Sequence, residues 1–311
     1  MNIKSLIFCI FAVLSIGASA YDFSVANKDG ITIYYDITSA SECKVTYKEY
    51  VMANTCGFMD YSYSSDYSGN VTVPSSVTYN GNAYAVTSIG THAFFRCSSL
   101  TAIEIPASVK SIGDAAFMGC SNINSIEIPD GVTSIGNYAF RDCKKLTSMK
   151  IPHGVTAIGE GTFAGCSSLS SIAIPNSVTS FGNLIFWGCQ NLTSVNIPNS
   201  VKTFDKGPFY ECTGLASITI PNRVTFIERY SFEGCRSLTT VEIGNGATFI
   251  GKYVFEGCSS LTSATVNLPK PLPAINTFEG VNLGKVTLNV PAGSAELYKA
   301  SPDWKGFGTI K

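Results

Sequence analysis

FEGCSSLTSATV, at residues 255–266, is one copy of a motif that recurs along most of the chain. Close copies are FAGCSSLSSIAI at 163–174 and FFRCSSLTAIEI at 94–105, and each copy has a single cysteine at the same place. Aligned on the segment VTSIG, eight units begin 23 residues apart, at Val86, Val109, Val132, Val155, Val178, Val201, Val224 and Ala247. A constant period without insertions predicts a solenoid, in which each coil buries its apolar edge against its neighbours.

The consensus unit, V-x-x-I-G-x-x-x-F-x-x-C-x-x-L-x-x-I-x-I-P-x-x, predicts two short extended segments in every coil. Its Phe, Cys and Leu are three residues apart, which is typical of one edge of a tight, 3₁₀-like turn. After the Leu the apolar residues alternate, so Ile103 and Ile105 should point into the core and Glu104 out of it. VTSIG gives the second extended segment. Coils stacked at roughly 4.8 Å would pair these segments in parallel sheets around one continuous core.

The segments on either side of the repeats predict caps, which a stacked array needs at its ends. We expect a signal peptide at residues 1–20, an N-terminal β cap at 21–70, a degenerate first coil at 71–85, eight repeats at 86–268, and a degenerate last coil with a C-terminal cap at 269–311. Asn80-Gly81 in the first coil predicts a hairpin turn. In the C-terminal segment, Ser294 is a predicted helix N-cap.

Five bulky apolar residues are expected to close the C-terminal end of the array. Leu297, Tyr298 and Trp304 are predicted to cover the final coil. Phe226 and Phe249 replace the small third residue of the unit in the last two repeats, and we expect them to pack against the C-terminal cap. Both groups would bury apolar surface that no further repeat covers.

The N-terminus predicts an export signal. Lys4 precedes the apolar stretch SLIFCIFAVLSIG, and the small residues ASA end at Ala20, where cleavage is expected. The stretch is too short for a membrane span, and Cys9 lies inside it and not just after a small-residue motif. No later stretch of the sequence is apolar enough to cross a membrane. We therefore expect an exported protein without a transmembrane segment in its mature form.

The charge balance gives no reason to expect nucleic acid as a partner. Removal of residues 1–20 takes one of the 21 Lys and Arg residues and none of the 22 Asp and Glu, which leaves a formal net charge of −2. This balance does not provide the basic surface that nucleic acid or an anionic membrane requires. The mature chain is long enough to bury a stable core without cross-links, and we expect it to be a monomer.

The repeated cysteine has three interpretations. Structural zinc needs closely spaced ligands, but the repeat cysteines are 23 residues apart and His92 and His153 are the only histidines. Disulfides between coils satisfy the Cα distance, yet parallel side chains that point the same way give an unfavourable torsion. Val281 occupies the cysteine position of the ninth coil, which favours a buried apolar role for the thiols. Outside the repeats, Cys43 and Cys56 are a candidate disulfide.

The pattern L-x-x-I-x-I within a 23-residue unit resembles the leucine-rich repeat, and SVTSIGxxAFxxCSSLTSIxIP is similar to its BspA-like class. The resemblance covers residues 70–291. The segments SGNVTVPSSVTYNGNAYAVTSIG and VPAGSAELYKASPDWKGF are also similar to secreted members from Bacteroides-type anaerobes. This resemblance implies a β-rich α/β solenoid, a right-handed stack of leucine-rich-repeat coils. It also implies a secreted or cell-surface role in adhesion and protein binding, without catalysis or a cofactor.

Two rows of outward side chains are candidate ligand surfaces. The residues along the strands are mostly small and polar, which fits either a flat binding surface or a solvated face. The residue after each repeat phenylalanine varies most in character, and there Trp187 and Tyr210 occupy adjacent coils. They could anchor a protein interface or stack on sugars, or they could pack over neighbouring turns. The candidate residues are Phe95, Arg141, Trp187 and Tyr210 on the turns and Glu104, Glu127 and Lys150 on the strands.

The sequence does not indicate catalysis. His92 and His153 lie two coils apart and have no matched Asp or Ser motif. Glu104 and Glu127 would lie about 5 Å apart, as the carboxylates of retaining glycosidases do, but any repeated Glu gives this pairing. We expect a protein that binds a host or microbial protein or glycoprotein, such as extracellular matrix or another cell surface. The alternatives are a glycan-binding module and a structural surface component without a specific ligand.

Overall fold

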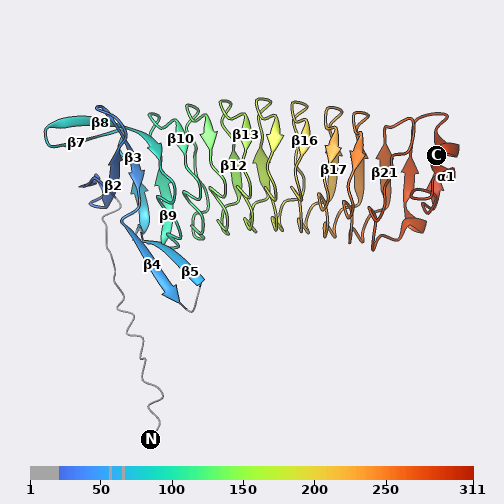
Figure 1. Ribbon diagram of the computed structural model, residues 1–311, viewed down its shortest axis with the longest axis horizontal. Helices are drawn as coiled ribbons and strands as arrows, with labels where there is room; N and C mark the ends of the chain where they lie inside the picture. Colours follow the sequence, from blue (N-terminus) through green and yellow to red (C-terminus); the bar gives the residue numbers. More distant parts are fainter. Residues whose placement is uncertain (1–20, 56–57, 65–66) are drawn as a thin grey trace, which may run out of the picture.

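In the computed structural model, which describes residues 21–55, 58–64 and 67–311, the chain is a long β-solenoid. The coils are stacked along one axis, with the N-terminal strands at one end and the helix α1 (Ala295–Ala300) at the other (Figure 1). Within the described ranges the helical elements are α1 and the 3₁₀ turn η1 (Leu283–Lys285), so the expected α/β character is not found. Neither is long and apolar enough to cross a bilayer. The predicted export signal at 1–20 lies outside the described residues.

Most coils contribute a short strand and a longer one, and strands of the same kind pair in parallel within several separate sheets along the stack. The short strands, whose outer surface we call the short-strand face, are the end of β8 (Asn82–Ile89), β10 (Ser111–Ile112), β11 (Ser134–Ile135), β13 (Ala157–Ile158), β15 (Ser180–Phe181), β16 (Thr203–Phe204), β18 (Phe226–Ile227) and β20 (Phe249–Ile250). The longer strands, whose outer surface we call the long-strand face, are β6 (Gly69–Thr72), β9 (Leu100–Glu104), β12 (Ser148–Lys150), β14 (Ser171–Ala173), β17 (Ser217–Ile220), β19 (Thr240–Ile243), β21 (Ser263–Val266), β22 (Thr287–Asn289) and β23 (Thr309–Ile310). Ser111 lies opposite Ser88 on one side and Ser134 on the other, so the register between coils equals the sequence period.

The repeat phenylalanines form a continuous column through the core. Neighbouring rings from Phe94 to Phe278 have centroids 5.1 to 5.7 Å apart and planes 2 to 20° apart. Tyr67 extends the column at the N-terminal end, 4.7 Å from Phe94, and Trp304 meets Phe278 edge-on at 5.5 Å. Each ring adds buried apolar area and ring–ring attraction, so the column stabilises the stack only while every coil keeps its phenylalanine in register.

The repeat cysteines are buried free thiols, as predicted. Seven of them donate the S–H to the carbonyl of the preceding coil's phenylalanine at 3.0 to 3.2 Å: Cys120, Cys143, Cys166, Cys189, Cys212, Cys235 and Cys258. Burial raises the pKa of Cys166 and of Cys258 to about 12, so the reactive thiolate is disfavoured. The thiol therefore fills space and also supplies a weak hydrogen bond between coils.

The turn that carries the phenylalanine has the i→i+3 bonds that the spacing predicts: in the second repeat Cys120 N–H donates to the Phe117 carbonyl at 3.1 Å and Ile123 N–H to the Cys120 carbonyl at 3.3 Å. Alternate amides of the same turn point instead to the next coil. In the second repeat, Ala115, Phe117 and Gly119 donate N–H bonds of 2.7 to 2.8 Å to carbonyls of the third repeat. Ala115 and Gly119 have φ angles of 49° and 78°, and this left-handed backbone aims alternate amides along the stack. The turns therefore form a third ladder between coils, which uses the amides that a helix would need.

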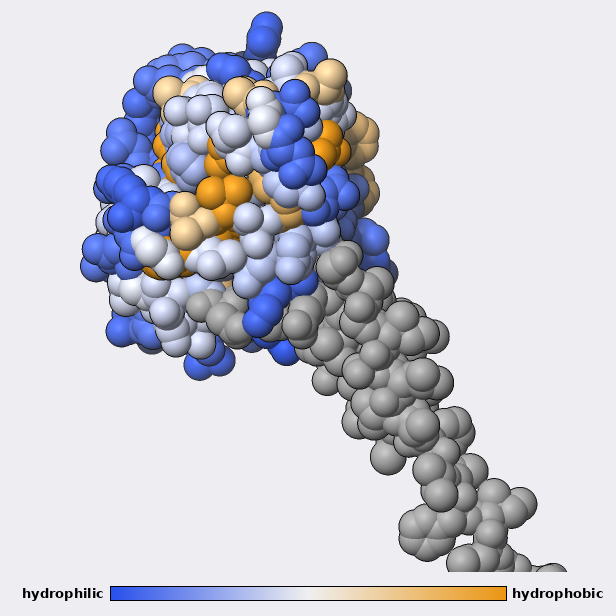
Figure 2. All heavy atoms as spheres, turned by 90° about the vertical axis from the view of Figure 1, so that its left-hand side faces the viewer, coloured by the Kyte–Doolittle hydropathy of each residue, from blue (hydrophilic) through white to orange (hydrophobic). Residues whose placement is uncertain are grey.

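An antiparallel sheet precedes the coils at the N-terminal end. It contains β1 (Phe23–Ala26), β2 (Thr32–Ile37) and β3 (Glu42–Thr46), and β3 then pairs in parallel with β8. β7 (Ser76–Tyr79) and β8 form the predicted hairpin, with φ angles of 49° at Asn80 and 78° at Gly81. A second hairpin, of β4 (Glu49–Thr55) and β5 (Phe58–Ser64), extends away from the coils (Figure 1). Viewed from this end, polar residues surround a mixed, partly apolar centre (Figure 2).

The last coil departs from the period by one residue. Ser263 lies opposite Thr287, one position later than the regular period would place its partner, and η1 falls within this longer coil. Tyr298 and Trp304 are fully buried, as expected for residues that cover it. The Tyr298 hydroxyl donates to the Leu268 carbonyl at 3.0 Å, and Trp304 Nε1 donates to a carbonyl at 2.8 Å. These bonds hold the C-terminal segment on the end of the stack.

Three expectations for this end are corrected. Phe226 and Phe249 do not pack against the C-terminal segment but are 47 % and 43 % exposed, because the third position of the unit points outward and that segment covers the end of the stack. Leu297 is also 47 % exposed, because α1 buries the adjacent Tyr298 on its inner side. Ser294 precedes α1 as predicted, but its Oγ donates to the Pro269 carbonyl at 3.0 Å and does not cap the helix.

Phe163→Ala is expected to lower the free energy of unfolding by about 3–5 kcal/mol, because it removes a fully buried ring of the column and leaves a cavity. Chemical denaturation followed by circular dichroism measures the change. The matched control is Phe226→Ala, the same substitution at an exposed ring. An equal loss in the two variants would contradict the structural role of the column.

Cys166→Val is expected to change the free energy of unfolding by only about 1 kcal/mol, since S–H is a weak donor. The last coil already has Val281 at this position, and the Phe140 carbonyl still accepts the N–H of Cys143 at 3.2 Å. Cys166→Ala, which adds a cavity, should cost more in the same denaturation experiment. The opposite order of the two variants would show that the thiol is more than a packing residue with a weak bond.

Candidate binding surface

The side chains at the tenth position of each unit form a row along the turns, which we call the turn ridge. Six of the eight are half-buried: Met118, Arg141, Trp187, Tyr210, Glu233 and Glu256. The other two, Phe95 and Ala164, are only 9 % and 2 % exposed. Phe95 is thus not the exposed ligand residue that the sequence predicts, because its ring lies edge-on to His92 at 5.2 Å and 5.1 Å below the guanidinium of Arg96.

Arg141 and Trp187 meet across an intervening coil. The guanidinium carbon lies 5.6 Å from the centre of the Trp187 ring, although the two residues belong to the third and fifth repeats. The fourth repeat has Ala164 between them, and this short side chain leaves room for the guanidinium to cross. Arg141 also lies 5.7 Å from the Tyr138 ring, and its Nε is 3.3 Å from Asp142 Oδ2. Two aromatic faces and one carboxylate therefore fix the position of this cation.

Trp187 and Tyr210 are neighbours, as their places on adjacent coils predict. Their ring centres are 6.5 Å apart and their planes differ by 41°. Trp187 Nε1 donates to Glu211 Oε2 at 3.2 Å, which orients the indole. Arg141, Trp187 and Tyr210 together form one half-buried surface, which we call the ridge patch. The rings contact neighbouring turns, as the packing interpretation expects, and they also reach the surface, so their role as a ligand anchor stays a prediction.

Sequence reasoning missed the aromatic residues at the seventh position of the unit. Tyr138 contacts Arg141, while Tyr230 and Tyr253 stack with ring centres 5.7 Å apart and planes 4° apart. Arg229 lies 5.6 Å from the Tyr230 ring. A signal for these residues was present, because tyrosine occupies this position in three of the eight units and glycine, histidine or aliphatic residues occupy it elsewhere.

The C-terminal part of the turn ridge is acidic. Glu233 and Glu256 follow Tyr210 at the tenth position, and Glu211 lies beside it. Burial, and then the charges of Glu256 and Glu211, raise the pKa of Glu233. Its Oε2 is buried and has no hydrogen-bond partner among the described residues. Burial and these carboxylates also raise the pKa of Tyr210. The charge of the turn ridge therefore changes along the stack, from the cation Arg141 to the carboxylates Glu233 and Glu256.

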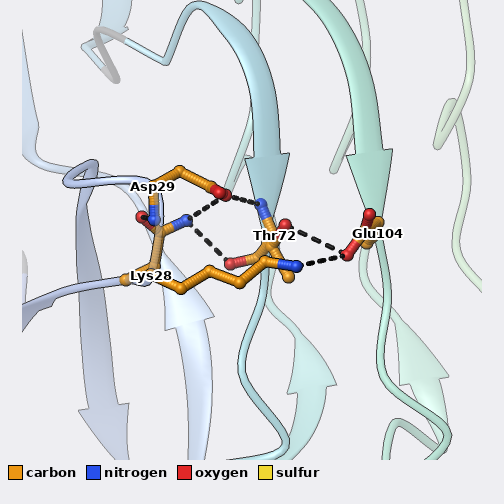
Figure 3. A network of polar contacts seen from close by, with 5 residues as sticks. Lys28, Asp29, Thr72 and Glu104 are labelled. Atoms are coloured by element: carbon orange, nitrogen blue, oxygen red, sulfur yellow. Dashed lines mark hydrogen bonds and ion pairs between the residues drawn. The ribbon is translucent and has the colours of Figure 1, made fainter.

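Glu104, a candidate on the long-strand face, is engaged within the protein. Its Oε2 accepts a hydrogen bond of 3.0 Å from Thr72 Oγ1 and lies 3.3 Å from Lys28 Nζ (Figure 3). Asp29 Oδ2 accepts the N–H of Thr72 at 3.2 Å in the same network. Each exposed contact contributes little alone. Together they join the loop between β1 and β2 to strands β6 and β9.

The other two charged candidates do not complete a site with Glu104. Lys150 Nζ pairs with Asp130 Oδ1 at 3.3 Å, and Glu127 is exposed on the coil between Glu104 and Lys150. Glu127 and Lys150 line the same shallow depression on the long-strand face, together with serine, isoleucine and proline. Lys28 binds Glu104 elsewhere, so this face carries separate exposed ion pairs and no convergent set of charges among the described residues.

Where the structure describes them, the thiols and histidines are not brought together in one site. Cys43 is a buried free thiol in β3 whose pKa burial raises to about 11. Cys56 lies outside the described residues, so its pairing with Cys43 stays a prediction. Burial lowers the pKa of His92, while His153 is exposed in a turn two coils away. Over the residues that the structure describes, no three Asp, Glu, His or Cys side chains are grouped to hold a metal ion.

Known proteins similar to this chain have leucine-rich repeats. A sequence profile of the BspA type Leucine rich repeat region, with 6 copies, matches residues 60–193 and 183–293. A T. pallidum leucine rich repeat protein is 31 % identical, with a TM-score of 0.47 over 74 % of this chain and 87 % of that one. A leucine rich cell surface protein of Faecalibacterium prausnitzii is 21 % identical, with a TM-score of 0.52 over 94 % and 96 %. A Bacteroides ovatus leucine-rich repeat protein is 23 % identical, with a TM-score of 0.48 over 94 % and 99 %. No curated protein matches the chain.

Glu233→Gln is expected to raise the free energy of unfolding at neutral pH, because burial and the charges of Glu256 and Glu211, which raise the pKa of Glu233, make its ionisation unfavourable in the folded protein. The gain should disappear as the pH falls through the pKa of Glu233, because below the unfolded-state pKa both side chains are neutral. Denaturation curves between pH 3.5 and 7.5 measure it, with buffers on the order of one pH unit apart. Glu279→Gln, at the same repeat position but exposed, is the control, and the same pH-dependent gain there would refute the explanation.

Proposed function

Because the chain belongs to the BspA-type leucine-rich repeat family, we propose that it is a secreted or surface-associated, non-catalytic protein that binds a protein or glycoprotein of a host or of another microbe through its turn ridge. Export is supported by the signal-like sequence of residues 1–20, and a surface role by the Faecalibacterium prausnitzii relative, whose name describes a cell surface protein. In this proposal the segments 21–70 and 269–311 act as caps that end the stack.

The observation that carries the proposal is the ridge patch. Arg, Trp and Tyr are the residues most enriched among those that dominate the energy of protein interfaces. Here all three occupy adjacent or nearly adjacent coils, with Arg141 held over Trp187 and Trp187 held by Glu211. Since these contacts exist before any ligand binds, little side-chain entropy is lost on association. The ridge patch therefore offers a preorganised anchor on a rigid support.

A protein ligand is favoured over a glycan because of the position of Arg141. A sugar that stacks on an indole needs a free ring face, and the Arg141 guanidinium already lies over the Trp187 ring. A protein can instead contact the guanidinium edge, the Tyr210 ring and the neighbouring carboxylates together. The glycan-binding module and the structural component without a ligand remain outcomes of the experiment.

Residues 21–311 should be screened for binding to an array of extracellular-matrix proteins, bacterial surface proteins and glycans. For a protein that binds, Trp187→Ala with Tyr210→Ala should weaken binding about 10-fold or more, because two central anchors are lost. Met118→Ala, at the same ridge position in the second repeat, is the matched control and should bind as the wild type.

Three results would contradict the proposal. If the double variant binds its protein as tightly as the wild type, the ridge patch is not the anchor. If glycans alone bind, the chain is a glycan-binding module. If no component binds, the structural role is favoured. Thermal unfolding of each variant establishes that a loss of binding is not a loss of fold.

A further inference from the structure

Two phenylalanines stand exposed on the short-strand face. Phe226 in β18 and Phe249 in β20 are 47 % and 43 % exposed, with ring centres 6.1 Å apart and planes inclined by 41°. In the first six repeats the same position holds a small residue: Ser88, Ser111, Ser134, Ala157, Ser180 and Thr203. The stack therefore does not need a large side chain at this position. Apolar rings left in water on a rigid sheet are typical of an interaction surface.

Basic residues flank the short strands that carry these two rings and the short strand before them. They lie within three residues of a short strand in the last three repeats, at positions 2, 6 and 23 of the unit, and all are exposed: Lys202, Lys206, Arg223, Arg229 and Lys252. In the first five repeats the same three positions of the unit hold one basic residue, Lys110, and two acidic ones, Asp114 and Glu160. The positive charge is thus concentrated where the phenylalanines are.

The basic residues are not neutralised by ion pairs within the part of the chain that the structure describes. The ion pairs found there involve other residues, and Arg229 has only the Tyr230 ring as a charge-linked contact. Asp205 and Glu228 are the acidic residues that directly follow the short strands of these repeats. Five cations against two anions make this a positive surface on a chain that is slightly negative overall.

We propose that Phe226, Phe249 and the five surrounding basic residues form a docking surface for an acidic polypeptide segment that carries apolar side chains. An apolar centre with a charged rim is the usual arrangement of a protein interface. Carboxylates of the segment would pair with the Lys and Arg side chains, and its apolar residues would cover the two rings. Successive coils repeat at about 4.8 Å, so an extended segment that crosses the coils meets cations at regular intervals.

Other anionic partners fit the surface less well. A sulfated glycan or a nucleic acid would use the basic rim but leave the apolar rings without a matching partner. A second copy of the chain would bring its own acidic ridge residues, Glu233 and Glu256, to the basic rim. These occupants are separate outcomes of the experiment below. The docking surface lies on different residues from the ridge patch and does not rest on the function proposed for it.

The test compares two variants that restore residues found elsewhere in the repeats. The first variant, Phe226→Ser with Phe249→Ser, introduces the serine that the first repeats have at the third position of the unit. The second variant, Lys206→Asn with Arg229→Asn and Lys252→Asn, introduces the asparagine that the third and fifth repeats have at the sixth position. All five residues are exposed, so both variants should keep the wild-type thermal unfolding curve. Lys110→Thr, a basic residue of the same face in the second repeat, is the control.

The probe is a displayed library of random linear peptides, selected on the chain from Tyr21 to Lys311, with heparin and an oligodeoxythymidine as anions without apolar side chains. We expect the selected peptides to be rich in Asp and Glu together with aromatic or aliphatic residues. Their affinity should fall about 10-fold or more in each variant and should fall with added salt, as charge pairing requires. It should be unchanged in Lys110→Thr and in the Trp187→Ala, Tyr210→Ala variant, which separates this proposal from the ridge patch.

Three outcomes would overturn the proposal. The first is that the library yields no acidic and apolar peptides, or yields peptides that bind the serine variant as tightly as the wild type. The second is that heparin or the oligonucleotide competes equally well and depends only on the basic residues, which would indicate a general polyanion site. The third is concentration-dependent self-association of the wild type that the serine variant abolishes, as sedimentation would measure, which would identify a second copy as the occupant.

Discussion

The hydrogen-bond register between coils is the constraint on which the rest of the structure depends. The turns send amide bonds forward to carbonyls of the next coil, and the cysteines from the second repeat onward reach back to a carbonyl of the coil before. Both sets of bonds form together only if every coil has the same length. An inserted residue would displace the ring column, the thiol bonds and both sheets together. In this chain the departures from the constant coil length accordingly lie at the ends of the array, in the β7–β8 hairpin and in the coil that contains η1.

The repeat made much of the fold predictable from the sequence. The period, the two extended segments, the buried Phe163 and Cys166, and the Asn80-Gly81 hairpin all follow from spacing and residue type. The i→i+3 turn after each phenylalanine also follows from the spacing, but the left-handed φ angles in it do not, because they occur at residues as different as Tyr138 and Leu184. These angles are imposed by the amide ladder between coils, which local spacing does not reveal.

The candidate site was predictable only in part, for a related reason. Adjacent coils placed Trp187 beside Tyr210, as the register requires. The contact between Arg141 and Trp187 depends on the size of Ala164 in the coil between them, which is a property of three units together. The burial of Phe95 likewise results from its neighbours and not from its position in the unit. Exposure at a repeat position is therefore decided by the coils on either side.

The thiol column links the folding of this protein to its chemical environment. In the stack the repeat thiols are enclosed and seven of the eight donate to a neighbouring coil, while burial raises the pKa of Cys166 and Cys258 to about 12 and so disfavours exchange. Before the coils stack, none of this protection exists, and eight cysteines spaced evenly along a flexible chain can pair with one another in many ways. Each such cross-link would hold two coils out of register. In an oxidising medium, correct folding therefore depends on the coils stacking faster than the thiols are oxidised.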